Sequence, residues 1–252
     1  MREFVQSSCI LAAMAAAAYG QTFEVASIKV SQVFRQGGEG RGRVDIQAVP
    51  GSVTMRNVAL GHAMIWAYKV SPAQINNFQN AMDERYDILA KAGGPAKTDE
   101  MRIMMQALLA ERFKLALHHE TKEMSAYALT EAKGGHKLKE SQAADGNGVL
   151  PVQGKMALGG QSATLDQLAM FLSDPLRAPV IDMTGLKGRY DFTFDLSDYL
   201  PKGPRQPSEP EPDPVSILQM ALPKQLGLKL EARKLPIDML IIDHFEKPSL
   251  EN

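Results

Sequence analysis

The sequence predicts an α+β protein made of two related halves, and three observations support that prediction. The triplet Arg-Tyr-Asp occurs at 85–87 and again at 189–191, which is 104 positions later. Upstream of each copy, apolar residues recur at the spacing of one helix face. Downstream of each copy, a second helical stretch precedes an alternating Leu-x-Leu strand. We therefore expect an internal duplication of small β-α-β-β-α-β-type units with antiparallel or mixed sheets.

The first helix of each half is predicted from its i, i+3, i+4, i+7 apolar spacing. The residues are Leu60, Ala63, Met64 and Ala67 in the first half and Leu165, Leu168, Ala169 and Leu172 in the second. Thr164 and Gln167 form the pattern of a capping box at the start of the second of these helices. Ala59 occupies the matching place in the first half, so the start of that helix is less clearly marked.

The second helices have their own start and stop signals. We expect one helix to begin at Thr98, and its counterpart to begin with Asp213 as the N-cap and Pro214 as the first helical residue. Pro223 should end or kink that counterpart after about eight residues, because proline removes an intrahelical hydrogen bond. Gly227 then provides a left-handed cap before the strand that follows.

The two halves differ in length. Segments 105–129 and 218–242 align without a gap at an offset of 113, whereas the Arg-Tyr-Asp copies are 104 positions apart. The second half therefore carries nine additional residues between these two places. These residues fall within 201–214, which contains six prolines. Proline favours an extended, solvated backbone, so we expect a stiff loop there.

The Arg-Tyr-Asp copies are expected to be equivalent strands. Alternation along a strand places Arg and Asp on one face and Tyr on the other. Tyr86 and Tyr190 should therefore pack in the core, with the charged residues forming a same-face ion pair on a half-exposed sheet. The alternative is that Arg189 and Asp191 are a charged binding pair. A further strand is expected at 23–30 and a hairpin around 49–52.

The N-terminus has the pattern of an export signal. Arg2 precedes an alanine-rich apolar run of about ten residues, which is too short to span a bilayer. Small residues precede Gln21, as signal-peptide cleavage requires. Cleavage would remove Cys9, the single cysteine, and leave a product without disulfides. The alternative is a buried N-terminal helix.

The expected domain organisation follows from these patterns. Residues 1–20 form a signal peptide, 21–139 a first repeat unit, 140–151 a linker, and 152–252 a second repeat unit with the insertion 201–214. The chain is 44% hydrophobic and 23% charged, as in globular proteins, and its net charge is −1. This near-neutral charge disfavours a role in nucleic-acid binding, and we expect no membrane span after signal cleavage.

The chain resembles a known family along nearly its whole length. The matching stretches are "FEVASIK", "VTMRNVAL", "RYDI", "LLAERFKLALHHETKEMSAYAL", "TGLKGRYDF", "QLGLKLEARK" and "IIDHFEKPS". They are similar to an exported bacterial family of unknown function that is described as soil-associated. The resemblance implies no established activity and no catalytic residues. Relatives of this domain also occur fused to membrane metallopeptidase sensors, but this chain has no His-Glu-x-x-His motif, so no peptidase function is implied.

Each half also has a weaker likeness to a smaller module. The stretches "SATLDQLAMFLSDPLRAPVIDMTGLKGRYDFTFDL" and "SILQMALPKQLGLKLEARKLPIDMLII" resemble the short N-terminal module of secretins and TonB-dependent receptors. That module is a small α+β protein-interaction unit. The insertion 201–214 and Pro223 depart from its pattern.

The string "LHHE" is the best candidate for a metal or acid–base site. On a strand, His118 and Glu120 share one face. Zinc would need two or three further ligands, from His62, His136, Asp87 or elsewhere, and none of these has a supporting spacing. The alternative is a polar strand end without chemistry, because the second half has Glu-Ala-Arg at the matching place, 231–233. We favour this alternative.

The expected function is therefore an exported, non-enzymatic interaction or sensing module of the bacterial envelope. We predict no catalytic residues, no cofactor and no bound metal, and the expected partner is an envelope protein or a cell-wall component. Two alternatives remain open. One is a structural envelope component that self-associates through sheet edges, and the other is a metal-dependent enzyme using His118 and Glu120.

Overall fold

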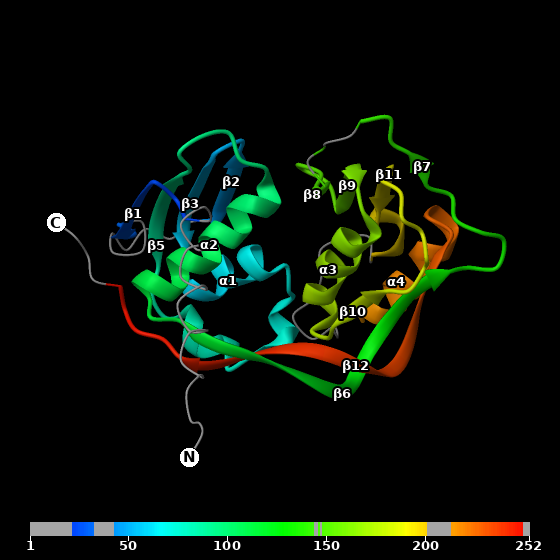
Figure 1. The fold of residues 1–252 in the computed structure, drawn as a ribbon. Helices are drawn as coiled ribbons and strands as arrows, with labels where there is room; N and C mark the ends of the chain where they lie inside the picture. The colour runs from blue at the N-terminus through cyan, green and yellow to red at the C-terminus, as the bar shows by residue number, and fades with distance from the viewer. Residues whose placement is uncertain (1–21, 33–42, 144–145, 147, 201–212, 249–252) are drawn as a thin grey trace, which may run out of the picture. The chain divides into compact units, whose positions relative to one another are not determined.

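The computed structural model describes residues 22–32, 43–143, 146, 148–200 and 213–248. The expected signal peptide at 1–20 and residues 201–212 of the expected loop lie outside the described residues. The fold is α+β, as predicted, with helices and three four-stranded sheets in the described part of the chain (Figure 1). No described helix has both the length and the apolar character that crossing a membrane requires.

The chain divides into two compact units that do not coincide with the two halves of the sequence. Unit 1 comprises 1–69, 77–118 and 242–252, and unit 2 comprises 70–76 and 119–241. Residues 70–76 and 119–139 of the first half thus belong to unit 2. The last residues of the second half belong to unit 1.

Unit 1 contains one antiparallel sheet with two helices. The sheet has the order β1-β5-β3-β2. Its elements are β1 (Val25–Val30), β2 (Asp45–Val49), β3 (Ser52–Val58) and β5 (Tyr86–Lys91), with α1 (Leu60–Tyr68), the short helix η3 (Phe78–Met82) and α2 (Thr98–Arg112). The hairpin expected around 49–52 joins β2 to β3, and the strand expected at 23–30 is β1.

Methionine and aromatic side chains fill the core of unit 1. Met64 of α1 and Met101 and Met105 of α2 are completely buried. Tyr86 is also buried, and its ring meets Phe113 edge to face with 5.2 Å between the ring centroids. The predicted core position of Tyr86 is therefore confirmed.

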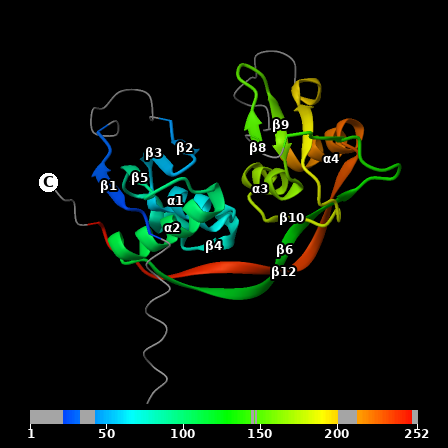
Figure 2. The same cartoon turned by 45° about the horizontal axis from the view of Figure 1, so that its top comes forward.

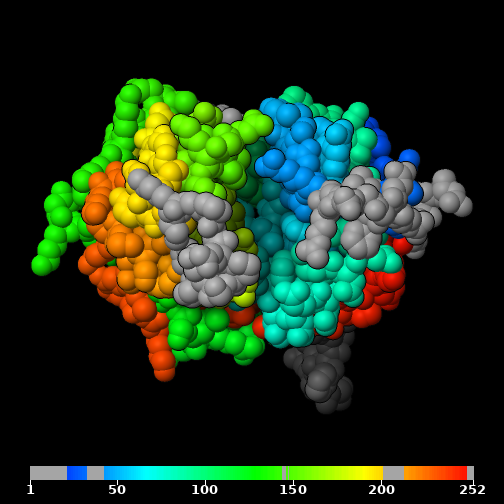
Figure 3. All heavy atoms as spheres, turned by 180° about the vertical axis from the view of Figure 1, so that it is seen from behind, coloured from blue at the N-terminus to red at the C-terminus, as the bar shows by residue number. Residues whose placement is uncertain are grey.

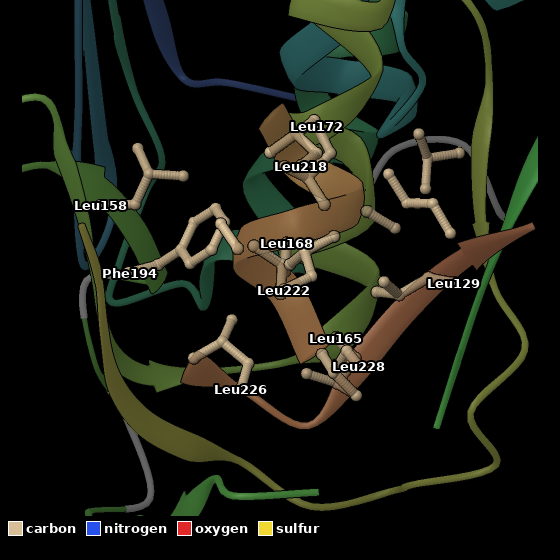
Figure 4. Packing of buried hydrophobic residues seen from close by; sticks show 14 of the residues in the cluster. Leu129, Leu158, Leu165, Leu168, Leu172, Phe194, Leu218, Leu222, Leu226 and Leu228 are labelled. Atoms are coloured by element: carbon tan, nitrogen blue, oxygen red, sulfur yellow. The ribbon is translucent and has the colours of Figure 1, made fainter. Parts of the chain in front are cut away.

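Unit 2 contains a sheet whose strands follow the same order along the sheet as those of unit 1. The order is β7-β11-β9-β8, with antiparallel pairing throughout. The elements are β7 (Lys139–Glu140), β8 (Gly148–Pro151), β9 (Ala157–Ala163), β11 (Tyr190–Asp195), α3 (Leu165–Leu176), the short helix η4 (Ser197–Tyr199) and α4 (Pro214–Gln225). Leucines of α3 and α4 face Phe194 of β11 in the core (Figure 4), and Tyr190 is buried there as predicted.

A second sheet in unit 2 is built around two long strands. Its order is β10-β6-β12-β4. The strands are β4 (Ile75–Asn76), which follows the short helix η2 (Pro72–Gln74), β6 (Ala116–Glu131), β10 (Val180–Asp182) and β12 (Leu228–His244). Both ribbon views show β6 and β12 running side by side (Figures 1 and 2). The two short strands, β10 and β4, pair in parallel with them.

The Arg-Tyr-Asp triplets hold the strand-to-helix corners. The amide N–H of Asn57, which has a φ of 53°, donates to Asp87 Oδ1 at 2.8 Å, and Arg85 Nη1 donates to the carbonyl oxygen of Asn57 at 3.4 Å. These side chains were expected to form a same-face ion pair. Instead, both bind the backbone of one residue in the left-handed conformation, next to a register shift between β3 and β5.

The same corner occurs in the second half. Ser162 has a φ of 49°, its N–H donates to Asp191 Oδ1 at 2.8 Å, and its carbonyl oxygen accepts from Arg189 Nη1 at 2.9 Å. The hydrogen bond from the Ser162 amide is the largest cause that lowers the pKa of Asp191. Each corner residue stands three positions before the first residue of a helix, so the triplet sets the direction in which that helix leaves the sheet.

The helix ends agree with the sequence, except that Pro223 does not end α4. The capping box of α3 is present, with hydrogen bonds between Thr164 and Gln167 in both directions. Asp213 caps α4, and Gly227 has the expected left-handed backbone. However, α4 continues to Gln225 and contains Pro223. Proline is tolerated in this last turn because the carbonyl that it leaves unpaired belongs to an exposed residue, Gln219.

The segment expected to be a linker is partly a strand. Residues 148–151 of the expected linker 140–151 form β8, an edge strand paired with β9. Four residues, one of them glycine and one proline, carry too little alternation to be recognised from the sequence. Proline is compatible with this position because β8 lies at the edge of its sheet.

Candidate functional site

The three polar residues of the "LHHE" string lie on β6 and are exposed, and each has a partner of its own. His118 Nδ1 lies 2.9 Å from the carboxylate of Asp243 on β12, and His119 Nδ1 lies 2.8 Å from Asp238 Oδ2. Glu120 instead pairs with Lys122 on its own strand at 3.0 Å. The structure therefore does not direct His118 and Glu120 toward a common point.

The further ligands considered for zinc are engaged elsewhere. Asp87 accepts the amide of Asn57 at its corner. The ring of His136 packs edge to face on Tyr190, with 5.7 Å between centroids, and His62 lies in the first turn of α1. Within the described ranges, no three His, Cys, Asp or Glu side chains are grouped so that they could hold a metal ion.

His62 instead has a clear structural role. Its Nδ1 accepts the amide N–H of Ala59 at 3.1 Å, and Arg85 Nη1 lies 3.4 Å from the same nitrogen. His62 thus caps α1 in the way that Gln167, 105 positions later, caps α3. Burial is the main cause that lowers the pKa of His62 to about 4, and the positive charge of Arg85 acts in the same direction.

The most promising binding feature is an apolar pocket in unit 2, with a volume of about 490 Å³. It lies between the start of β9, the end of β11 and the facing sides of α3 and α4. Its lining includes Leu158, Phe171, Leu172, Phe194, Ile217 and Leu218. Four of the labelled residues in Figure 4, Leu158, Leu172, Phe194 and Leu218, belong both to this lining and to the core. The pocket is thus a place where the core of unit 2 opens to solvent.

Hydrogen bonds fix the chain around this pocket. Gln225 at the end of α4 donates to the carbonyl oxygen of Asp195 at 2.6 Å and accepts its amide N–H at 2.9 Å. The amide of Leu196 donates to the carbonyl oxygen of Met156 at 2.8 Å. These backbone contacts hold Leu196 and Met156 together at the wall of the pocket.

The chemistry of the lining favours an apolar ligand. The charged residues of the lining are Lys155 and Asp174, so the pocket wall carries no net charge. Met156 also lines it and is 60% exposed, which leaves an apolar side chain in water. Covering such a surface is favourable by about 25 cal/mol for each Å² of apolar area.

Unit 1 has a pocket of a different character, with a volume of about 600 Å³. Its lining includes Ala92 and Met104, which match Leu196 and Ile217 of the apolar pocket at the offsets of 104 and 113. It also includes the carboxylates of Glu24 and Glu100. The two pockets therefore differ in polarity, and the one in unit 2 is suited to an apolar group.

Sequence patterns alone did not reveal the apolar pocket. Its residues come from five helices and strands and from the segments beside them, and many of the apolar ones also fit the pattern of an ordinary core position. The available signal was local: Leu196 and Leu200 follow β11 outside any regular strand, and Met156 is an apolar residue just before β9.

The structure defines an α+β protein with an apolar pocket in unit 2. The model of the family described as "Protein of unknown function (DUF3738)" matches residues 62–245, and the chain belongs to this family. No curated protein and no solved structure matches the chain.

The pKa of His62 predicts a specific pH dependence of stability. Unfolded His62 takes up a proton below about pH 6.5, whereas the folded protein resists protonation down to about pH 4. The free energy of unfolding should therefore fall as the pH drops from 6.5 to 4, with this contribution constant below pH 4. His62→Gln should keep the cap and remove this part of the slope, as measured by urea unfolding at several pH values. An unchanged slope in the variant would contradict this role.

Replacing His118, His119 and Glu120 together by Gln should change little. All three are exposed, and surface ion pairs contribute about 0–1 kcal/mol each to stability. We expect a small shift of the melting temperature and no change in metal content, measured by thermal unfolding and elemental analysis. If the purified protein holds stoichiometric zinc that the triple variant loses, the metalloenzyme alternative is correct instead.

Proposed function

We propose that the chain is an exported, non-enzymatic interaction or sensing module, and that the apolar pocket of unit 2 receives an apolar group of its partner. The observation that carries this proposal is an open pocket whose wall is apolar and whose mouth exposes Met156. Its volume lies within the range of about 300–1,000 Å³ that is usual for ligand sites. The partner we propose is an envelope protein or a cell-wall component.

The N-terminal sequence supports export. Its ten-residue apolar run and the small residues before Gln21 are typical of a signal peptide. The absence of catalysis is proposed because His118 and Glu120 engage different partners, Asp243 and Lys122. The likeness of each half to the interaction module of secretins and TonB-dependent receptors agrees with a binding role.

An internal duplication is part of the proposal. Its support comes from the corners at Asn57 and Ser162, which are 105 positions apart and share a positive φ and the same two contacts. The first sheet of each unit also has its strands in the same order pattern. A duplicated scaffold explains how one copy of the pocket could become apolar while the other acquired carboxylates.

Self-association is the second candidate, and the edges of the unit 1 sheet favour it. Val25 on β1 and Val49 on β2 are each 58% exposed, and both strands are at an edge (β2 is light blue in Figure 3). Exposed apolar edge strands can pair with another chain. A mass that rises with protein concentration would favour this candidate over a monomeric binding module.

The pocket can be tested with the neutral fluorescent probe N-phenyl-1-naphthylamine. We expect saturable binding of one probe per mature chain, and Met156→Glu should weaken it about tenfold, because a carboxylate then faces the apolar mouth. Met220→Glu is the matched control: Met220 has similar exposure, 50%, and does not line the pocket. Titration by fluorescence measures both variants.

Two results would contradict the assignment of the pocket. One is the absence of saturable probe binding to the mature chain. The other is an equal loss of affinity in Met156→Glu and Met220→Glu. Thermal unfolding of both variants serves as the folding control, and neither exposed substitution should shift the melting temperature by more than a few degrees.

A further inference from the structure

The second sheet of unit 2 alternates between the two halves of the sequence. Its order is β10-β6-β12-β4. β10 and β12 come from the second half, and β6 and β4 come from the first. Every strand of this sheet therefore has neighbours from the other half alone, and no pair is formed within one half.

The two parallel pairs of the sheet are equivalent to each other. Ile75 of β4 pairs with Leu240 of β12, and Val180 of β10 pairs with Tyr127 of β6. Ile75 and Val180 are 105 positions apart, which is the offset of the first helices. Tyr127 and Leu240 are 113 positions apart, which is the offset of the second helices. In one pair the short strand comes from the first half and the long strand from the second. In the other pair the short strand comes from the second half and the long strand from the first.

The pairing of β6 with β12 has the same symmetry. Glu246 N–H donates to the carbonyl oxygen of Phe113 at 2.7 Å at one end of the two strands, and Ala132 N–H donates to that of Gly227 at 2.9 Å at the other. The strands therefore run in opposite directions. Lys114 and Gly227, 113 positions apart, precede the two strands, and both have a positive φ, 50° and 65°. An antiparallel pair of equivalent strands is the contact that a two-fold axis produces.

We propose that the chain is a strand-exchanged pair in which each half supplies the C-terminal strand that the other half needs. The proposal rests on the duplication proposed above. Simple side-by-side pairing of two complete halves would give the order β4-β6-β12-β10, with β4 and β10 each next to the long strand of its own half. The observed order reverses the two short strands.

Buried side chains from both halves stabilise this exchange. Ala126 from the first half and Ile237 and Met239 from the second form one buried cluster. Met124 of β6 and Ile241 of β12 pack against it. Because neither half alone contains all of this cluster, separating the halves would expose its apolar surface to water.

The partner that each half fits is therefore another copy of the same unit. In this chain, covalent fusion provides that copy, as domain swapping provides it between separate chains. A module of this kind presents two related but different pockets from one chain. The exchange thus couples the stability of the apolar pocket to a strand that the first half contributes.

Four cysteine pairs in the mature chain test the exchange. Two pairs join neighbours in the structure: Asn76→Cys with Ile241→Cys, and Ile181→Cys with Ala128→Cys. Two matched pairs join the same four positions within each half: Asn76→Cys with Ala128→Cys, and Ile181→Cys with Ile241→Cys. A protease site introduced between Gln142 and Ala143 lets the N- and C-terminal fragments separate on a non-reducing gel.

After mild oxidation, the first two pairs should link the two fragments at least about tenfold more efficiently than the matched pairs close a loop within one fragment. Each of the four positions occurs in one pair of each kind. A substitution that prevents folding would therefore lower disulfide formation in both kinds of pair. Faster bond formation in the within-half pairs would overturn the proposal. So would the absence of linked fragments from both pairs that are neighbours in the structure.

Discussion

The pairing of β6 with β12 is the contact on which the rest of the structure depends. It organises the second sheet of unit 2, because β10 and β4 attach to its two outer edges. It also continues into contacts within each unit, with Glu246 bonded to Phe113 in unit 1 and Ala132 bonded to Gly227 in unit 2. Without this pairing, the four-stranded sheet would separate into two pairs of strands and the buried cluster at Ala126 and Ile237 would be exposed.

The two Arg-Tyr-Asp corners apply a second constraint, since they fix where α1 and α3 leave their sheets. The tyrosine is buried, while arginine and aspartate hold the backbone of a residue with a positive φ. Other positions differ between the two units. His62 caps α1 where Gln167 caps α3, and Leu196 and Ile217 line the apolar pocket where Ala92 and Met104 line the other. The proposed binding role depends on that difference.

Local features were predictable from the sequence, and strand partners were not. Apolar spacing located α1 and α3, and the Thr164–Gln167 pattern located a cap, because these depend on residues a few positions apart. The exchange involves Ile75 and Leu240, and alternation shows that a segment is a strand without showing its neighbour. The ion pair expected within Arg-Tyr-Asp was wrong, because the competing ligand is a backbone group more than 25 residues away. The pocket was missed because its lining has the composition of a core.

Amide hydrogen exchange tests most directly whether the two halves complete each other. Leu168→Ala in α3 removes a fully buried side chain and should cost about 2–5 kcal/mol. If the chain is a strand-exchanged pair, the variant should show an equal fall in the free energy of amide opening at Ala128 of the first half and at Leu240 of the second. Both residues lie in one cooperative sheet. If Leu240 loses protection while Ala128 keeps the value of the unsubstituted protein, the halves fold independently and the account is wrong.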